Sequence, residues 1–268
     1  MKQVKEMERL DKILANNGFG TRKEVKHFIR SKTVTVDGIV ICDTDAKVNI
    51  NSSVIAVNGV EIEVKAQVYF MMNKKAGYVC STRSGFNPTV FDLLKEKDNG
   101  KYLGGNLNIV GRLDLDTEGL LILTSDGDLN HRLTSPKWNI PKKYLVYLRD
   151  SVNENQRKVY AEEIEKGIHI GPDGKEGEAD CKPGKLEWYD KNAYRNAEGK
   201  TPADVCALTV YEGMFHEVKR IFAALGNEVI YLKRLSVNNL ELDESLEPGE
   251  YRELSQEELK LLDTGAAD

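Results

Sequence analysis

The spacing of apolar residues predicts a small module of helices and hairpins at the beginning of the chain. Apolar positions with helical spacing come first, and Thr21 with Glu24 forms a capping box that begins a second helix. Two later apolar runs are each divided by a turn pair, Asp37-Gly38 and Asn58-Gly59, as in tight hairpins. We therefore expect a helix-helix-hairpin module over residues 1–65.

The remainder of the chain, residues 66–268, alternates between strand patterns and short helical patterns. Apolar or alternating runs predict strands at 68–72, 119–124, 141–148 and 208–211. Helical spacing predicts helices at 89–94, 126–133 and 216–225. Polar, turn-rich stretches predict a mobile loop at 97–105 and surface loops at 171–184 and 190–202. This alternation indicates a larger α+β domain after the first module.

The composition is that of an ordinary globular protein, with 40% hydrophobic and 30% charged residues. No apolar run approaches the roughly 20 residues that span a bilayer, and the first residues contain no apolar signal core. We therefore expect a cytoplasmic protein without a membrane partner. The four cysteines are far apart in the sequence, which predicts neither a disulfide framework nor a zinc site.

The net charge of −5 is distributed unevenly along the chain. Residues 1–36 have a net charge of +5, whereas residues 237–268 have a net charge of −8. The chain without its acidic end is therefore positive, which is compatible with binding to phosphates. Four cations of the second predicted helix share an outward face, namely Arg22, Lys23, Lys26 and Arg30.

Candidate chemistry concentrates in an acidic turn before the predicted strand at 119–124. Asp114 and Asp116 lie in this turn, and Arg112 places a cation two residues from Asp114. Gly111 and Gly119 bracket the turn and permit a positive φ or a close approach of the backbone. The turn therefore places two carboxylates and a cation beside a buried strand, as a reactive carboxylate requires.

Three interpretations of this turn compete. Asp114, Asp116 and Glu118 occupy the first ligand positions of an EF-hand calcium loop, but Ser125 stands where that loop requires a bidentate glutamate. Aspartates in loops also commonly accept hydrogen bonds from nearby backbone groups and have no further role. The third interpretation, a catalytic carboxylate, depends on the residues around the turn.

The residues around the turn form a recognisable motif. Gly-Arg-Leu-Asp-x-Asp-Thr-x-Gly-Leu-Leu-x-Leu-Thr-x-Asp-Gly, which begins at Gly111, closely resembles the active-site signature of pseudouridine synthases. The strand that contains Tyr144 resembles the family's second motif, in which a tyrosine faces the target base. Gly-x-x-His-x-Val-Lys-Arg, which ends at Arg220, resembles the third motif, whose basic residue pairs with the catalytic carboxylate.

The first module resembles a small RNA-binding domain that is named after a small-subunit ribosomal protein. The resemblance rests on the segments at 9–12, 21–24 and 34–38. Such a domain contacts phosphates and recognises RNA shape with little reading of bases. The complete chain resembles the branch of pseudouridine synthases that modifies bacterial ribosomal RNA, and the small-subunit (16S) enzymes most closely.

This resemblance implies a catalytic domain on a mixed, mainly antiparallel sheet with flanking helices. It implies isomerisation of a uridine in ribosomal RNA to pseudouridine, with Asp114, Tyr144 and Lys219 as catalytic residues. Contacts with the substrate are expected from the four cations of the second helix and from Arg112, His216 and Arg220, with Arg220 as an alternative partner of Asp114. No cofactor or metal is expected, because the reaction consumes nothing.

The resemblance also implies partners and leaves alternatives open. We expect a monomer whose partner is ribosomal RNA or a ribosomal assembly intermediate. In one alternative the target uridine lies in large-subunit (23S) RNA. In the other, the protein is a non-catalytic RNA-binding factor for ribosome assembly that keeps the fold.

One position departs from the third motif. Glu217 stands where the family usually has glutamine, between the histidine and the valine. One helical turn separates Glu217 from Arg220, which is the spacing of surface ion pairs on helices. We therefore expect Glu217 on the outside of its helix, paired with Arg220.

Overall fold

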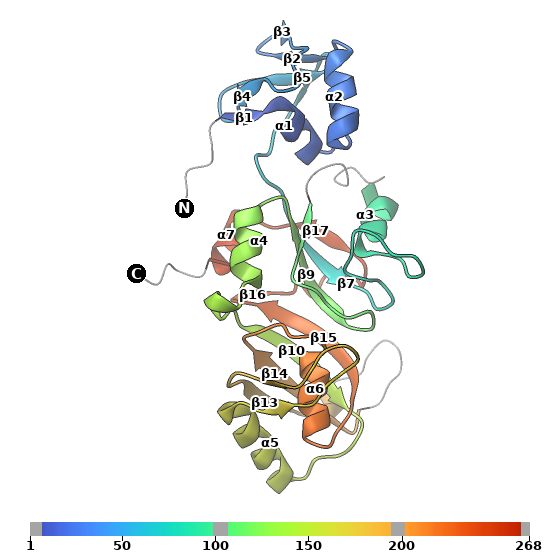
Figure 1. The fold of residues 1–268 in the computed structure, drawn as a ribbon, viewed down its shortest axis with the longest axis vertical. Helices are drawn as coiled ribbons and strands as arrows, with labels where there is room; N and C mark the ends of the chain where they lie inside the picture. The colour runs from blue at the N-terminus through green and yellow to red at the C-terminus, as the bar shows by residue number, and fades with distance from the viewer. Residues whose placement is uncertain (1–6, 99–106, 194–201, 264–268) are drawn as a thin grey trace. The chain divides into compact units, whose positions relative to one another are not determined.

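The computed structural model describes residues 7–98, 107–193 and 202–263 (Figure 1). These residues belong to two compact units, which are described separately. The first unit comprises Met1–Phe70, Ser81–Ile109 and Leu123–Asn130, and the second comprises Met71–Cys80, Val110–Ile122 and His131–Asp268. The domain boundary that we expect near residue 65 stays a prediction.

The N-terminal part of the first unit has the predicted helices and hairpins. Helices α1 (Leu10–Asn16) and α2 (Arg22–Arg30) pack together, and the capping box of Thr21 and Glu24 is confirmed. Both predicted turn pairs have positive φ angles at both residues, as type I′ turns require. The strands form one sheet in the order β3 (Ile39–Val40), β2 (Val34–Val36), β5 (Ile55–Val57), β6 (Val60–Ile62). A second pair joins β1 (Met7–Arg9) to β4 (Lys47–Asn49).

The large sheet is mixed and mainly antiparallel, as expected. Its strand order is β13 (Lys185–Tyr189), β14 (Asp204–Val210), β10 (Lys142–Leu148), β15 (Val229–Val237), β9 (Glu118–Thr124), β7 (Tyr69–Lys74), β17 (Tyr251–Glu253). Strand β16 (Leu240–Glu241) pairs with β15, and β8 (Asn108–Val110) pairs with β9. The pairs β13–β14, β14–β10 and β10–β15 are antiparallel, whereas β15 and β9 are parallel.

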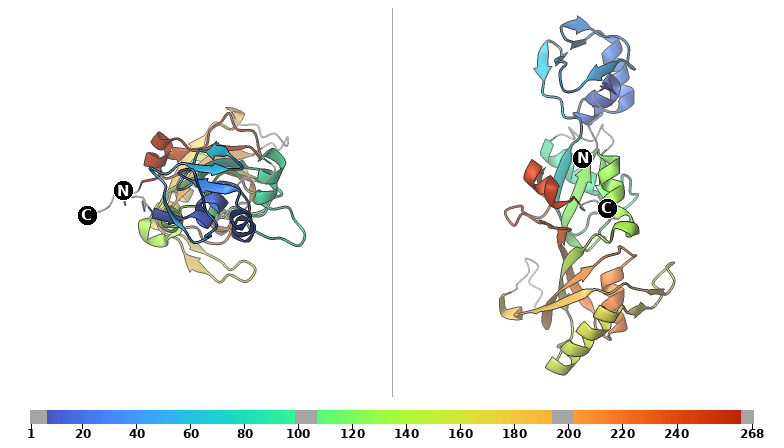
Figure 2. Two further views of the ribbon diagram at one scale, coloured as in Figure 1. Left: turned by 90° about the horizontal axis from the view of Figure 1, so that it is seen from above. Right: turned by 90° about the vertical axis from the view of Figure 1, so that its left-hand side faces the viewer.

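Helices and short hairpins accompany this sheet. The predicted helices correspond to α3 (Val90–Asp98), α4 (Gly127–Thr134) and α6 (Glu217–Ala224), and a short helix α7 (Gln256–Leu261) follows β17. Figure 1 and the right-hand view of Figure 2 show α6 beside α5 (Glu154–Lys166), a helix that the apolar pattern did not reveal because it buries only Tyr160 and Ile164. No helix in the described ranges is long and apolar enough to cross a membrane.

Two of the three predicted loops lie partly outside the described residues, which exclude 99–106 and 194–201. The third, at 171–184, contains more order than expected. Strand β11 (His169–Ile170) pairs with β12 (Ala179–Asp180), so that residues 171–178 form the loop of a short hairpin. Helix α6 packs against β11 and β15, which brings this hairpin to the helix of the third motif.

The strands with the first two motifs meet at Arg234 of β15. Arg234 is opposite Tyr144 on β10 and opposite Gly119 on β9. At Gly119, which has a φ of +99°, a Cβ atom would lie 2.3 Å from the carbonyl oxygen of Arg234. The parallel contact between β9 and β15 therefore requires glycine, both for its backbone conformation and for its lack of a side chain.

We predict that Gly119→Ala destabilises the protein by more than about 3 kcal/mol or prevents folding, because backbone atoms cannot move aside for the methyl group. Gly111→Ala is the matched control. Gly111 also has a positive φ, of +71°, but its added Cβ would meet only the Arg234 side chain, at 3.8 Å. Its expected cost is about 1–2 kcal/mol, from the backbone conformation alone. Denaturant unfolding measures both changes, and equal losses would contradict the steric argument.

Candidate active site

The buried ammonium group of Lys74, at the end of β7, holds the acidic turn by hydrogen bonds to its backbone. Lys74 Nζ donates hydrogen bonds to the carbonyl oxygens of Thr117 at 2.7 Å, Asp114 at 3.0 Å and Leu115 at 3.3 Å. Burial lowers the pKa of Lys74, and the acidic groups around it oppose that shift. Since these bonds use carbonyl groups of the backbone, the side chains of the turn remain free to face the site.

The carboxylates of the turn meet two basic side chains from the region of α6. Lys219 Nζ is 2.7 and 2.8 Å from the two oxygens of Asp116 and 3.7 Å from Oδ2 of Asp114. His216 Nε2 is 3.7 Å from Oδ1 of Asp114. The fold thus joins the first and third motifs, and it places Asp114 between two basic groups.

The two aspartates differ in their surroundings. The side chain of Asp116 is 68% exposed, whereas that of Asp114 is 26% exposed. Burial favours a higher pKa for Asp116, but the hydrogen bond and the charge of Lys219 outweigh it and lower the pKa. Lys219 also borders a small hollow with Asp116, Glu118 and Tyr231. Asp116 is therefore the hydrogen-bonded partner of Lys219, and Asp114 is the less exposed carboxylate beside it.

His216 has an unusual backbone conformation and a fixed side chain. Its φ of 48° and ψ of 28° lie in the left-handed region, immediately before α6. Nδ1 lies 2.7 Å from Oδ2 of Asp173, and the ring stacks on Phe215 with centroids 3.7 Å apart. The imidazole is thereby held with its other nitrogen toward Asp114.

Tyr144 is buried on β10 beside Arg234, whose side chain is also buried. Burial raises the pKa of Tyr144, and the charge of Arg234 and a hydrogen bond from it act in the opposite direction. Arg234 Nε donates to the carbonyl oxygen of Leu120 on β9. Arg234 therefore connects the tyrosine strand to the strand that follows the acidic turn.

The two arginines predicted to contact the substrate differ in exposure. Arg112 is exposed. Arg220 is buried, and its guanidinium donates to the carbonyl oxygens of Gly171, Gly177 and Phe215. Lys219, and not Arg220, is thus the cation near Asp114, while Arg220 holds the loop between β11 and β12.

The expectation for Glu217 was wrong. Its side chain is 5% exposed, and it accepts a hydrogen bond from the backbone N–H of Met214. Burial and the neighbouring Glu212 raise the pKa of Glu217 to about 7, although Lys142 opposes this shift. The two residues are one helical turn apart, as an ion pair requires. Arg220 binds loop carbonyls instead, and Glu217 is buried at the start of α6.

The four predicted cations of α2 belong to the first unit. Arg22, Lys23 and Arg30 are exposed. Lys26 is half-buried, with its ammonium group 3.7 Å from the buried carboxylate of Asp11. Burial favours a higher pKa for Asp11, but Arg9 and the other cations lower it. Three of the four predicted RNA contacts on α2 are therefore exposed, and Lys26 also neutralises Asp11.

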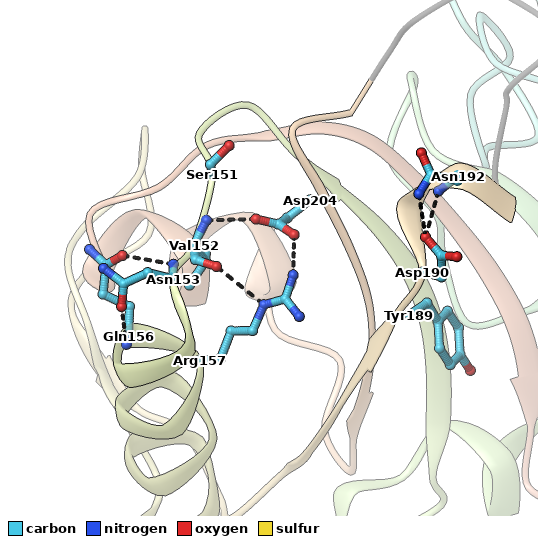
Figure 3. A pocket seen from close by; sticks show the side chains of 9 residues that line it. All are labelled: Ser151, Val152, Asn153, Gln156, Arg157, Tyr189, Asp190, Asn192 and Asp204. Carbon is cyan, nitrogen blue, oxygen red and sulfur yellow. Dashed lines mark hydrogen bonds and ion pairs between the residues drawn. The ribbon is translucent and has the colours of Figure 1, made fainter.

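A larger hollow, of about 460 Å³, lies beside the first residues of α5 (Figure 3). Asp204 accepts a hydrogen bond from the backbone of Val152 and forms an ion pair with Arg157 (Figure 3). Arg157 and Asp204 therefore neutralise each other, and Asp190 accepts hydrogen bonds from Asn192. Within the described ranges, no group of three or more His, Cys, Asp or Glu side chains is arranged to hold a metal ion.

Three residues of this region were missed by sequence reasoning. Lys74 carried a weak signal, because a lysine that ends an apolar strand needs acceptors if it is buried. Arg234 and Asp173 stand outside the three motifs. Their contacts come from strand pairing and from a loop, neither of which has a recognisable spacing in one sequence.

The chain is similar to two protein families and to individual known proteins. A family described as "RNA pseudouridylate synthase" matches residues 68–224, and the "S4 domain" family matches residues 8–54. The chain is 41% identical to the RNA pseudouridine synthase YtzG of Bacillus subtilis, over 95% of this chain and 98% of that protein. It is 40% identical to "Ribosomal small subunit pseudouridine synthase A" of Vibrio cholerae, over 94% of this chain and 97% of that protein. A crystal structure of a pseudouridylate synthase is 37% identical, with a TM-score of 0.60, and covers 95% of this chain and 99% of its own.

We predict that Glu217→Gln stabilises the protein above pH 7. A proton binds Glu217 more tightly in the folded than in the unfolded state, so its stabilising effect is complete below about pH 4.5 and is lost as the pH rises through about 7. Glutamine keeps the acceptor for Met214 without the charge. The expected gain at pH 8, relative to pH 5, is on the order of 1–3 kcal/mol in the free energy of unfolding.

Urea unfolding of the wild type and the variant at both pH values measures this difference. Glu162→Gln is the control, because Glu162 is exposed on α5 and its replacement should alter stability equally at both pH values. A Glu217→Gln variant with the pH dependence of the wild type would contradict the buried, protonated carboxyl.

Proposed function

The chain belongs to the RNA pseudouridylate synthase family, and we propose that it isomerises a uridine of small-subunit ribosomal RNA with Asp114 as the catalytic carboxylate. The observation that supports this role is the position of Asp114 between Lys219 and His216. The small-subunit relative of Vibrio cholerae and the family of RNA pseudouridylate synthases both support this substrate.

The reaction breaks the N1 glycosidic bond of uridine and joins C5 of the same base to the sugar. The proton on C5 leaves and N1 gains a proton, so that no other reactant is consumed. An ionised Asp114 acts on the substrate as nucleophile or base, and the positive charge of Lys219 stabilises its carboxylate. Because Lys219 is shared with Asp116, the site keeps this cation in place before RNA binds.

The target base must leave the RNA structure to reach Asp114. An enzyme that reacts with a base in structured RNA moves the nucleotide out of its stack and into a pocket. We assign to Tyr144 the contact with the ring of this base and to Arg112, which is exposed, the position that the base vacates. Arg220 takes a structural role in this proposal, because its donors are occupied by backbone carbonyls.

The first 65 residues form the RNA-binding domain in this proposal, and residues 66–268 form the catalytic domain. The exposed cations of α2 contact phosphates, which gives affinity without base reading. The protein acts as a cytoplasmic monomer on ribosomal RNA or on a ribosomal assembly intermediate. Mapping pseudouridines in ribosomal RNA from cells without the gene tests the substrate, and a missing modification in 23S RNA would transfer the target to the large subunit.

We predict that Asp114→Asn lowers isomerisation by at least about a thousandfold, because it removes the charge that reacts and keeps the shape. Asp116→Asn should keep at least about a tenth of the wild-type rate, since Lys219 stays near Asp114. Release of tritium from C5-labelled uridine in ribosomal RNA measures both rates. Equal losses in the two variants would reassign the catalytic role, and an inactive wild type would favour a non-catalytic assembly factor.

A further prediction concerns the salt dependence of RNA binding. Replacing Arg22, Lys23 and Arg30 together by glutamine should reduce the slope of log K against log salt by roughly 0.7–0.9 for each phosphate contact that is lost. Lys26 is left unchanged because it neutralises Asp11. Replacing the exposed Lys158, Lys166 and Lys260, which lie outside the first 65 residues, removes the same charge and serves as the control. Equal slopes for the two triple variants would argue against RNA binding by α2.

A further inference from the structure

The loop between β11 and β12 contacts the active site, although it belongs to none of the three motifs. Asp173 lies in this loop, and its Oδ2 is 2.7 Å from Nδ1 of His216. Nε2 of the same ring is 3.7 Å from Oδ1 of Asp114. The imidazole therefore lies between the proposed catalytic carboxylate and a carboxylate from a segment distant in the sequence.

This loop has a defined conformation. Asp173 and Glu176 exchange two backbone hydrogen bonds of 3.0 Å. Arg220 donates to the carbonyl oxygen of Gly171 from Nε at 2.9 Å and from Nη2 at 2.7 Å, and it also binds the carbonyl of Gly177. Because Arg220 belongs to α6, the loop is attached to the same helix that holds Lys219.

The histidine is arranged for a role other than helix capping. Its side chain makes no capping hydrogen bond to α6, although it occupies the N-cap position. A left-handed conformation at a residue other than glycine costs on the order of 1–3 kcal/mol and is concentrated at functional sites. Stacking on Phe215 and the contact with Asp173 fix the ring in the plane that directs Nε2 to Asp114.

We propose that Asp173 is a positioning residue for the isomerisation, which acts through His216 on Asp114. The proposal rests on the proposed function of Asp114. The charged groups that face the ring are Asp173, Asp114, Asp116 and Lys219. The contact with Asp173 holds Nε2 of the ring 3.7 Å from Oδ1 of Asp114, so the protonated form of His216 places a second positive charge beside Lys219 and stabilises the Asp114 carboxylate.

The same hairpin provides a matched control. Asp180 lies 2.8 Å from Nδ1 of His169, so this pair has the same chemistry as the pair of Asp173 and His216. Both members of the control pair are exposed, and the hydrogen bond to Asp180 raises the pKa of His169. If the loss of any Asp–His contact from this hairpin lowers activity, then replacing Asp173 and replacing Asp180 should have the same effect.

The kinetic test uses the full-length Asp173→Ala and Asp180→Ala variants with ribosomal RNA under single-turnover conditions. Asp173→Ala should lower the rate of isomerisation at saturating RNA by about tenfold or more, because His216 is no longer held toward Asp114. The half-saturating RNA concentration should stay within about twofold of the wild-type value, because the change does not alter the RNA-binding cations of α2. Asp173→Asn keeps an acceptor and should fall between this variant and the wild type. An unchanged rate for Asp173→Ala, or equal losses in Asp173→Ala and Asp180→Ala, would overturn the proposal.

A spectroscopic test separates this inference from the proposed function. The chain has four histidines, so ¹⁵N-histidine labelling gives a spectrum in which His216→Gln identifies the His216 signals. The Nδ1–H of His216 should give a slowly exchanging signal that disappears in Asp173→Ala and returns in Asp173→Glu. A signal that is unaffected in Asp173→Ala would refute the positioning role even in an active enzyme. Turnover by Asp114→Asn would instead refute the proposed function while the signal remains.

Discussion

The parallel contact between Gly119 and Arg234 is the constraint on which the active site depends. A Cβ atom at Gly119 would overlap the Arg234 carbonyl at 2.3 Å, so only glycine lets β9 and β15 pair at this point. The same Arg234 is opposite Tyr144 on β10 and donates through Nε to Leu120. One residue therefore connects the tyrosine strand with the strand that follows the acidic turn, and a displacement at this contact would separate the first two motifs.

The turn itself is shaped by Lys74, whose ammonium group bonds to backbone carbonyls of the turn. Its ammonium group is buried and binds three carbonyl oxygens between Asp114 and Thr117. A buried cation is costly unless its donors are satisfied, and here carbonyl oxygens of the turn supply the acceptors. The cost of burying Lys74 is thus offset by ordering the turn, which leaves both aspartate side chains directed to the α6 side.

The charges of the site are divided among three carboxylates and two basic groups. Lys219 binds Asp116 closely and Asp114 at a longer distance, whereas His216 lies between Asp114 and Asp173. Arrangements in which each charge has a partner need little rearrangement when a substrate arrives. Glu217 differs from these carboxylates. Burial and the neighbouring Glu212 raise its pKa and favour its protonated form.

The sequence alone determined the features that depend on residues close together in the chain. The capping box at Thr21, the type I′ turns, the large α+β domain and the motifs with Asp114, Tyr144 and Lys219 are local patterns, because capping and turn geometry join residues only a few positions apart. Such patterns also gave the family. Helix α5 was missed because it buries only two side chains and therefore has a weak apolar period.

Only the tertiary structure decided which charges meet. Spacing placed Glu217 one turn from Arg220, yet Glu217 is buried beside Glu212 and Arg220 binds loop carbonyls. The contacts of Asp173 with His216, and of Arg234 with Gly119, join segments that are far apart in the chain. Hydrogen bonds of this kind depend on strand pairing and loop closure, which leave no periodic signal in a single sequence, so their partners emerge only when the sheet has formed.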